Sequence, residues 1–224
     1  MYFSKIQLRS DATRATAFWS VLRTNEYDIH RQIWSLFADD RERKRDFLYR
    51  REDQKTSPTF YVLSQREPHN QSDLWDIKTK AYAPVLRPGL HLSFMLRANP
   101  IRSKKADNSK KQQRHDVVME AKTKLKNQHI PRHEWKPEAQ IIWEAGAAWI
   151  NSRAERAGFA IDQLVIDGYR QQRFNKSGHD VRISTLEYSG ILTVKDPELF
   201  TATLFHGIGP AKGFGCGLLL VRKI

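Results

Sequence analysis

Residues 207–219 read Gly-Ile-Gly-Pro-Ala-Lys-Gly-Phe-Gly-Cys-Gly-Leu-Leu, a glycine-rich run that separates the possible fold classes of this chain. Glycine lets a backbone approach a ligand closely and expose its N–H groups, and Lys212 adds a positive charge, so the run suits a phosphate. It follows a predicted helix rather than a strand, lacks the dinucleotide-binding spacing and has no Gly-Lys-Ser/Thr of a Walker loop. A nucleotide-binding α/β fold is therefore excluded, while a tight structural turn and a direct phosphate contact both remain open.

The segments around this run alternate between helices and strands. A short helix precedes it, with Asp196 placed as N-cap ahead of Pro197. A longer helix begins at Pro137 and ends before Gly158. Two β-rich runs flanking a polar tip predict a long hairpin between these helices. The predicted helices span 137–156 and 196–206, and the predicted strands span 159–169, 181–194 and 218–222.

The first half of the chain shows a comparable alternation. Apolar and polar residues alternate over residues 2–8, which predicts a half-buried strand. Ile29, Ile33, Leu36 and Phe37 recur at helical spacing and predict an amphipathic helix over 27–37. The remaining predicted strands, of which the first two form a hairpin, are 47–51, 59–65 and 91–97.

This order of elements predicts an α+β protein made of two tandem ferredoxin-like (RRM-like) domains. We expect an N-terminal domain over 1–100, a basic loop and linker over 101–136, and a C-terminal domain over 137–224. The sequence shows no obvious second helix before Leu90 in the first domain.

The charge of the chain points to a polyanionic partner. It carries 38 Lys and Arg against 25 Asp and Glu, a formal net charge of +13. Between Arg97 and Lys136 there are 12 basic and 4 acidic residues, so more than half of the excess lies there. Solvated surfaces usually mix the two signs, which favours a phosphate-binding surface. Residues 101–114 are almost free of apolar side chains and predict a loop that orders on its ligand.

The composition also excludes several classes of protein. No run approaches the ~18 apolar residues of a membrane helix, and the N-terminus does not resemble a signal peptide, so we expect a soluble cytoplasmic protein with no membrane partner. The single cysteine, Cys216, excludes an internal disulfide and a cysteine-rich zinc site. His129 and His133 have a spacing found in some metal sites, but Pro131 interrupts a helix there and no third ligand is evident. We therefore predict no metal and no cofactor.

Four segments in order along the chain resemble one known family. They are MYFSK at 1–5, YDIH at 27–30 leading to Trp34 and Leu36-Phe37, FMLRANP at 94–100, and the glycine-rich tail at 207–219. The tail resembles the C-terminal loop of the CRISPR-associated repeat-processing (RAMP) superfamily, and in its details the CasE family. The polar insert at 10–25 is longer than this family leads us to expect.

The resemblance implies a tandem ferredoxin-like fold and cleavage of CRISPR precursor RNA beneath a repeat stem-loop. It also implies retention of the mature crRNA and membership of the type I-E Cascade complex, whose other subunits would be partners.

Tyr27 and His30 are the candidate catalytic residues. They lie three apart on one helical face and match the family's catalytic tyrosine and histidine. RNA carries its own nucleophile, the 2′-hydroxyl, so cleavage needs a base, an acid and charge stabilisation but no metal. Histidine exchanges a proton near neutral pH, whereas tyrosine is better suited to orient the 2′-hydroxyl or the phosphate, so His30 is the stronger candidate.

Basic residues of the loop, the hairpin tip and the tail are candidates for RNA binding, because RNA stems are recognised mainly through phosphates and shape. The candidates are Arg102, Lys104, Lys105, Lys110, Lys111, Arg114, Arg170, Arg173, Lys176 and Lys212.

Three functions are compatible with these features. A metal-independent endoribonuclease would leave a 2′,3′-cyclic phosphate and a 5′-hydroxyl, and the alternative is a non-catalytic scaffold that binds an RNA hairpin. A DNA-binding regulator fits less well, because no recognition-helix unit or dimerisation heptad is visible.

Overall fold

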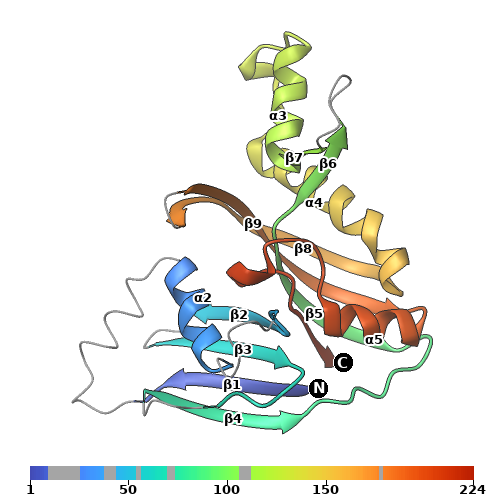
Figure 1. The fold of residues 1–224 in the computed structure, drawn as a ribbon. Coiled ribbons are helices and arrows are strands. Elements are labelled where there is room, and N and C mark those ends of the chain that lie inside the picture. Colours follow the sequence, from blue (N-terminus) through green and yellow to red (C-terminus); the bar gives the residue numbers. More distant parts are fainter. Residues whose placement is uncertain (10–25, 38–43, 54–56, 70–73, 106–111, 177–178) are drawn as a thin grey trace.

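The computed structural model describes residues 1–9, 26–37, 44–53, 57–69, 74–105, 112–176 and 179–224. Within these residues the chain forms two four-stranded antiparallel sheets and a separate two-stranded hairpin (Figure 1). The polar insert at 10–25 lies outside the described residues.

The first sheet has the order β2-β3-β1-β4. Its strands are β1 (Tyr2–Leu8), β2 (Phe47–Asp53), β3 (Pro58–Ser64) and β4 (Trp75–Ala81). Helix α2 (Glu26–Ser35) packs on one face, where Ile29 and Ile33 join Ile6, Phe60 and Val62 in a buried cluster. The predicted helix and the predicted strands 2–8, 47–51 and 59–65 are therefore confirmed, whereas β4 was not predicted.

The second sheet has the order β10-β5-β9-β8. Its strands are β5 (His91–Ala98), β8 (Phe159–Lys176), β9 (His179–Val194) and β10 (Leu219–Lys223). Helices α4 (Glu138–Ala154) and α5 (Pro197–His206) cover its core, which holds Trp149, Leu186 and Phe200. Asp196 caps α5 as predicted, accepting hydrogen bonds from the N–H groups of Glu198 and Leu199. Short 3₁₀ turns follow α4 at η3 (Glu155–Ala157) and precede β10 at η4 (Lys212–Phe214).

Both sheets have the strand arrangement of a ferredoxin-like unit. If the strands of each sheet are numbered 1 to 4 along the chain, both sheets have the spatial order 4-1-3-2. All neighbouring strands are antiparallel. The predicted α+β class with two tandem ferredoxin-like domains is confirmed. Among the residues the structure describes, no second helix lies between β3 and β4.

The segment expected to be a basic loop and linker is largely ordered. It forms the hairpin β6 (Ile101–Lys105) and β7 (Gln112–Asp116), then α3 (Val117–Asn127) and the turn η2 (Arg132–Glu134). The expectation of a loop over 101–114 was wrong for its described residues, because a polar hairpin can form from backbone pairing alone. In Figure 1 this insertion projects away from the second sheet.

The strand expected to complete the first domain lies instead in the second sheet. β5 pairs with β9 and β10, and β4 takes the edge position beside β1. We therefore propose that the boundary between the domains falls at 82–90 rather than at residue 100. None of the described helices is long and apolar enough to cross a membrane.

Candidate functional site

Helix α2 holds Tyr27 and His30 beside the second ferredoxin-like unit. Ile29 and Ile33 are buried under the helix, against the first sheet. Tyr27 and His30 therefore lie on a flank of the helix, at the border of its buried face. Both side chains are half-buried, and they lie one turn apart on α2. The helix contacts η4 of the glycine-rich run, so both candidate residues lie where the two units meet.

Aromatic rings surround the imidazole of His30. Its centroid lies 5.7 Å from that of Trp34, 6.5 Å from that of Phe47 and 6.2 Å from that of Phe214. A Cβ placed on Gly213 would lie 3.6 Å from Cε1 of His30, which is ordinary van der Waals contact. The glycine-rich run therefore covers the histidine directly.

The run is a closed loop anchored to β5. Gly207 has φ +74°, and a Cβ there would lie 2.7 Å from the carbonyl oxygen of Gly217, so glycine is required. The N–H of Ile208 donates to the carbonyl of Gly217 at 2.9 Å, and the N–H of Gly217 donates to that of Arg97 at 2.8 Å. The structural role left open by the sequence is thus present, since the loop is a tight turn that packs against α2.

Lys212 supplies a partly buried positive charge to this loop. Burial lowers the pKa of Lys212, and repulsion from Arg45 lowers it further. Burial also lowers the pKa of Arg45, whose guanidinium donates a hydrogen bond to the carbonyl of Phe47. Two like charges held near each other, partly removed from water, are arranged to receive an anion.

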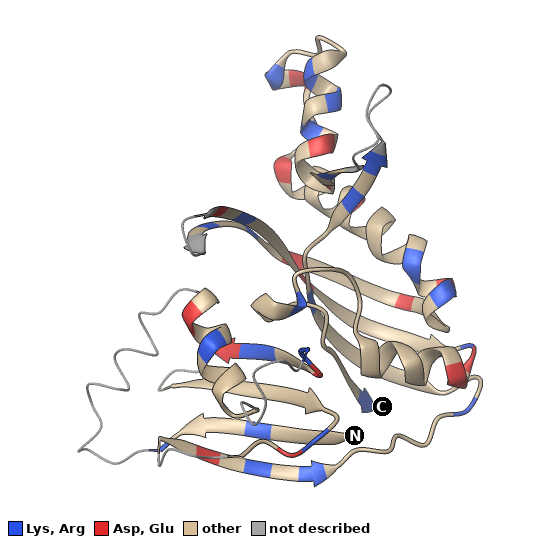
Figure 2. Cartoon of the chain, viewed as in Figure 1, with Lys and Arg blue, Asp and Glu red and all other residues tan. Residues whose placement is uncertain are grey.

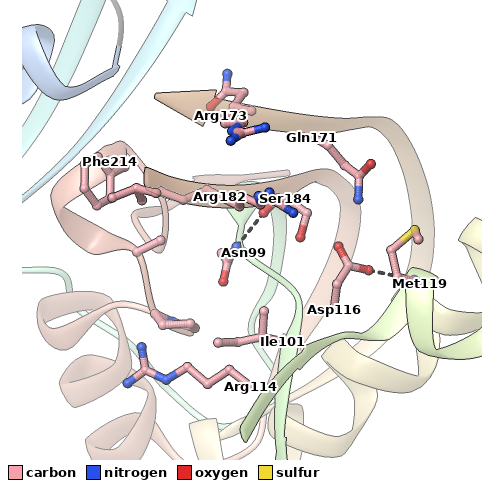
Figure 3. A pocket seen from close by; sticks show the side chains of 15 residues that line it. Asn99, Ile101, Arg114, Asp116, Met119, Gln171, Arg173, Arg182, Ser184 and Phe214 are labelled. Carbon is pink, nitrogen blue, oxygen red and sulfur yellow. Dashed lines mark hydrogen bonds between the residues drawn. The ribbon is translucent and has the colours of Figure 1, made fainter. Parts of the chain in front are cut away.

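A groove of about 820 Å³ lies beside the loop. It runs between the insertion and the β8–β9 hairpin, and Figure 3 shows Arg173 and Arg182 on one side, Arg114 on the other and Phe214 at one end. Because the Phe214 ring also contacts the ring of His30, the candidate catalytic histidine adjoins this end of the groove.

Arg173 and Arg182 of the groove both pair with Asp180 and still remain exposed. Asp180 binds Arg173 at 2.7 Å and Arg182 at 3.4 Å, and the hydrogen bond from Arg173 lowers the pKa of Asp180. The side chains of Arg173 and Arg182 are 68% and 72% exposed, so both can exchange this carboxylate for a phosphate.

The predicted basic residues are spread over several surfaces. Lys and Arg recur on the β6–β7 hairpin, on α3 and along the β8–β9 hairpin (Figure 2). Arg114 and Arg173 line the groove, whereas Arg170 lines a separate pocket between the two units. Arg102 is exposed on β6, and Lys104 forms an ion pair with Glu120. The side chains of Lys105 and Lys176, and all of Lys110 and Lys111, lie outside the described residues.

Sequence reasoning did not single out Arg45, Arg182 or Phe214. Arg45 belongs to the basic run RERKR at 41–45, and Arg182 lies opposite Arg173 in the hairpin that was predicted. Phe214 is the only non-glycine residue between Lys212 and Cys216. These signals are present in the sequence, but their proximity to His30 and to the groove comes from the tertiary fold.

The fold and site define a tandem ferredoxin-like protein whose C-terminal glycine-rich loop closes over a helix carrying tyrosine and histidine. A family model described as "CRISPR associated protein" matches residues 1–223, and the chain belongs to that family, as a member of its CasE type.

Individual relatives agree with this assignment. The chain is 33% identical over 226 residues to the Cascade subunit CasE of Escherichia coli strain K12, with 100% of both chains covered. It is 27% identical over 221 residues to the CRISPR-associated endoribonuclease Cse3 of Thermus thermophilus, covering 88% of this chain and 90% of that one. A solved structure of Cse3 bound to a 19 nt RNA superimposes with a TM-score of 0.71 at 24% identity, over 99% of this chain and 100% of the other, which supports the fold.

Proposed function

We propose that this chain is an endoribonuclease that cuts CRISPR precursor RNA at the base of the repeat stem-loop and stays bound to the crRNA as a Cascade subunit. Its relatives carry the names Cascade subunit and CRISPR-associated endoribonuclease. The observation that carries the proposal for this chain is the position of His30, which lies beneath the glycine-rich loop and adjoins the end of a basic groove.

The proposed reaction needs no metal, because the 2′-hydroxyl beside the scissile phosphate is the nucleophile. Its oxygen forms a bond to phosphorus while the bond from phosphorus to the 5′-oxygen breaks. The 2′-hydroxyl proton goes to a base, and the leaving 5′-oxygen takes a proton from an acid. The products are a 2′,3′-cyclic phosphate and a 5′-hydroxyl.

We assign the proton transfer to His30 and the orientation of the nucleophile to Tyr27. The aromatic rings around His30 restrict the positions its imidazole can take, which favours a fixed geometry for proton transfer. Lys212 and Arg45 are suited to stabilise the negative charge that develops on the phosphate, because both are partly buried and lie close enough to repel each other.

The groove beside the loop is the proposed seat of the RNA stem. RNA duplexes are bound chiefly through their phosphates and shape, and Arg114, Arg173 and Arg182 face this space from two sides. A stem held there would end at Phe214, so its base would lie beside His30. Arg102 and Lys104 lie on the β6–β7 hairpin that borders the groove. With Lys105, Lys110, Lys111 and Lys176 they remain predicted RNA contacts.

A cleavage assay in EDTA tests the enzyme proposal. The purified protein and its His30→Ala variant are incubated with a labelled hairpin RNA from the CRISPR repeat of its host. We expect the wild type to cut and the variant to bind without cutting, with a loss of rate on the order of 10²–10⁴. A substrate with a 2′-deoxy nucleotide at the scissile position must bind and stay intact, and normal cutting of it would exclude attack by the 2′-hydroxyl.

The alternative is a non-catalytic scaffold that binds the same hairpin. The basic groove and the fold suit it equally well, so neither separates the two functions. Tight binding with no cleavage by wild type or variant would support the scaffold.

A further inference from the structure

We propose that Glu187 is a positioning residue that locks the two ferredoxin-like units together and thereby seats His30 against the glycine-rich loop. Glu187 lies on β9 of the second sheet and bridges two arginines, Arg97 on β5 and Arg50 on β2 of the first sheet. These three residues are called the clasp. This inference rests on the proposed endoribonuclease function.

The geometry of the clasp divides one carboxylate between two cations. Oε1 of Glu187 lies 3.0 Å from Nε of Arg97, and Oε2 lies 3.0 Å from Nη2 of Arg50. Arg50 is only 5% exposed and Arg97 only 9% exposed. Nε of Arg50 also pairs with Glu52 on the same strand, so loss of Glu187 would still leave Arg50 a counter-charge within its own unit. The carboxylate of Glu187 is what joins the two buried guanidinium groups across the units, and removing it takes away a partly buried attraction between them.

The second sheet makes room for the Glu187 side chain. β8 has a bulge between Asp167 and Arg170 opposite this part of β9, and Gly168 within it has φ +59°. A Cβ on Gly168 would lie 3.0 Å from Cγ of Glu187, closer than most side chains tolerate. The bulge therefore leaves the carboxylate free to reach across to the first unit.

Arg97 and the residue next to Arg50 both hydrogen-bond the glycine-rich loop. The carbonyl of Arg97 accepts the hydrogen bond from the N–H of Gly217. Tyr49, the neighbour of Arg50, points to the opposite face of β2, and its hydroxyl donates to the carbonyl of Gly213 at 3.2 Å. Because Gly213 lies against His30, a shift of one unit relative to the other would move the loop and the histidine apart.

A neighbouring ion pair provides a matched control. Arg51 follows Arg50 on β2 and pairs with Asp53 at 2.6 Å, but Asp53 is on the same strand and its side chain is 63% exposed. Arg51 lines the pocket between the units as Arg50 does, but Arg51→Gln removes a charge whose partner Asp53 belongs to the same unit and leaves both contacts of Glu187 in place.

The test compares Glu187→Gln, Arg50→Gln and Arg51→Gln in single-turnover cleavage at saturating hairpin RNA, with hairpin affinity measured separately. We expect the cleavage rate to fall about 10²-fold in the first two variants, as a displacement near 1 Å can cause, with affinity little changed. Arg51→Gln should keep the wild-type rate. Wild-type rates for both clasp variants would overturn the inference.

A second measurement does not depend on cleavage. Spin labels at Lys78→Cys on β4 and Glu198→Cys on α5, both exposed positions, report the distance between the units, while Cys216 is buried. The distance distribution should broaden or shift in Glu187→Gln and Arg50→Gln, at a temperature where circular dichroism shows both folded. An unchanged distribution would overturn the inference even if cleavage slowed. If the wild type cut no RNA, the proposed function would fail. The spin-label distances in the variants would then be the test of whether Glu187 holds the two units together.

Discussion

The hydroxyl of Tyr49 donates a hydrogen bond of 3.2 Å to the carbonyl oxygen of Gly213, which joins a strand of the first sheet to the C-terminal loop of the second unit. Tyr49 is fully buried, and Gly215 of the same loop also packs on its ring. The loop that covers His30 is therefore held by a residue of the unit that carries His30. This arrangement makes the site dependent on both ferredoxin-like units.

Tyr49→Phe should remove the hydrogen bond to Gly213 without leaving a cavity in the core. We expect the free energy of unfolding to fall by about 1 kcal/mol, the usual net contribution of one hydrogen bond, and RNA cleavage to slow because the loop is less firmly seated. Urea denaturation and single-turnover cleavage measure the two effects. Tyr61→Phe on β3 is the control, since Tyr61 lies only half-buried against Phe3. Equal effects of both substitutions would contradict a special role for the contact with Gly213.

The two arginines of β8 should differ in their contribution to RNA binding. Arg173 lines the groove and Arg170 lines the pocket between the units, although the sequence predicted both as RNA contacts. Arg173→Ala should weaken hairpin binding and reduce the salt slope of the affinity by about 1, as expected for one lost phosphate contact. Arg170→Ala should change neither quantity. Titrations of the same hairpin at several salt concentrations measure both, and a larger effect of Arg170 would place the stem elsewhere.

The fold could be predicted where hydrophobic periodicity was strong. Ile29 and Ile33 marked α2, and the buried faces of β5 and β9 marked the second sheet. β4 was missed because it is an edge strand whose side chains beyond Trp75 are largely exposed. The β6–β7 hairpin was missed because Arg102, Lys104 and Arg114 face solvent, so no apolar alternation marks it.

The site could be predicted only in part. Tyr27, His30 and Lys212 were singled out as candidates from the resemblance and from the glycine-rich run, and they remain predicted site residues. The nearness of Arg45 to Lys212, and of Phe214 to His30, depends on the packing of the two units, which no local pattern encodes. The predicted assignment of β5 to the first domain failed for a related reason, because strand pairing is set by tertiary contacts rather than by order along the chain.

Lys212 should show a conflict between stability and binding. Its pKa is lowered from 10.5 in the folded protein, so the unfolded chain binds its proton more tightly. The resulting cost is present in full below the lowered pKa and disappears as pH rises through about 10.5. We expect Lys212→Met to be at least as stable as the wild type near neutral pH, with the difference narrowing at high pH, while RNA binding weakens.

Urea denaturation at neutral and alkaline pH, together with hairpin titrations, measures these effects. Lys223→Met at an exposed position of β10 is the control and should alter neither property. A loss of stability in Lys212→Met at neutral pH would show that the ammonium group stabilises the folded loop rather than destabilising it.

Replacement of Ala211 by glycine should change the free energy of unfolding in the opposite direction from the same replacement in a helix. It begins the turn η4 with φ +58° and ψ +27°, a left-handed conformation that costs an L-residue roughly 1–2 kcal/mol. Ala211→Gly removes this strain, so the free energy of unfolding should stay level or rise by up to about 1 kcal/mol, even though glycine is more flexible in the unfolded chain. Ala147→Gly, inside α4, should instead lower it by about 1 kcal/mol or more, because helical glycine is unfavourable and the site is buried. Thermal and urea unfolding of both variants compare the signs, and a destabilised Ala211→Gly would mean that the methyl group packs against the groove more strongly than the backbone strain opposes it.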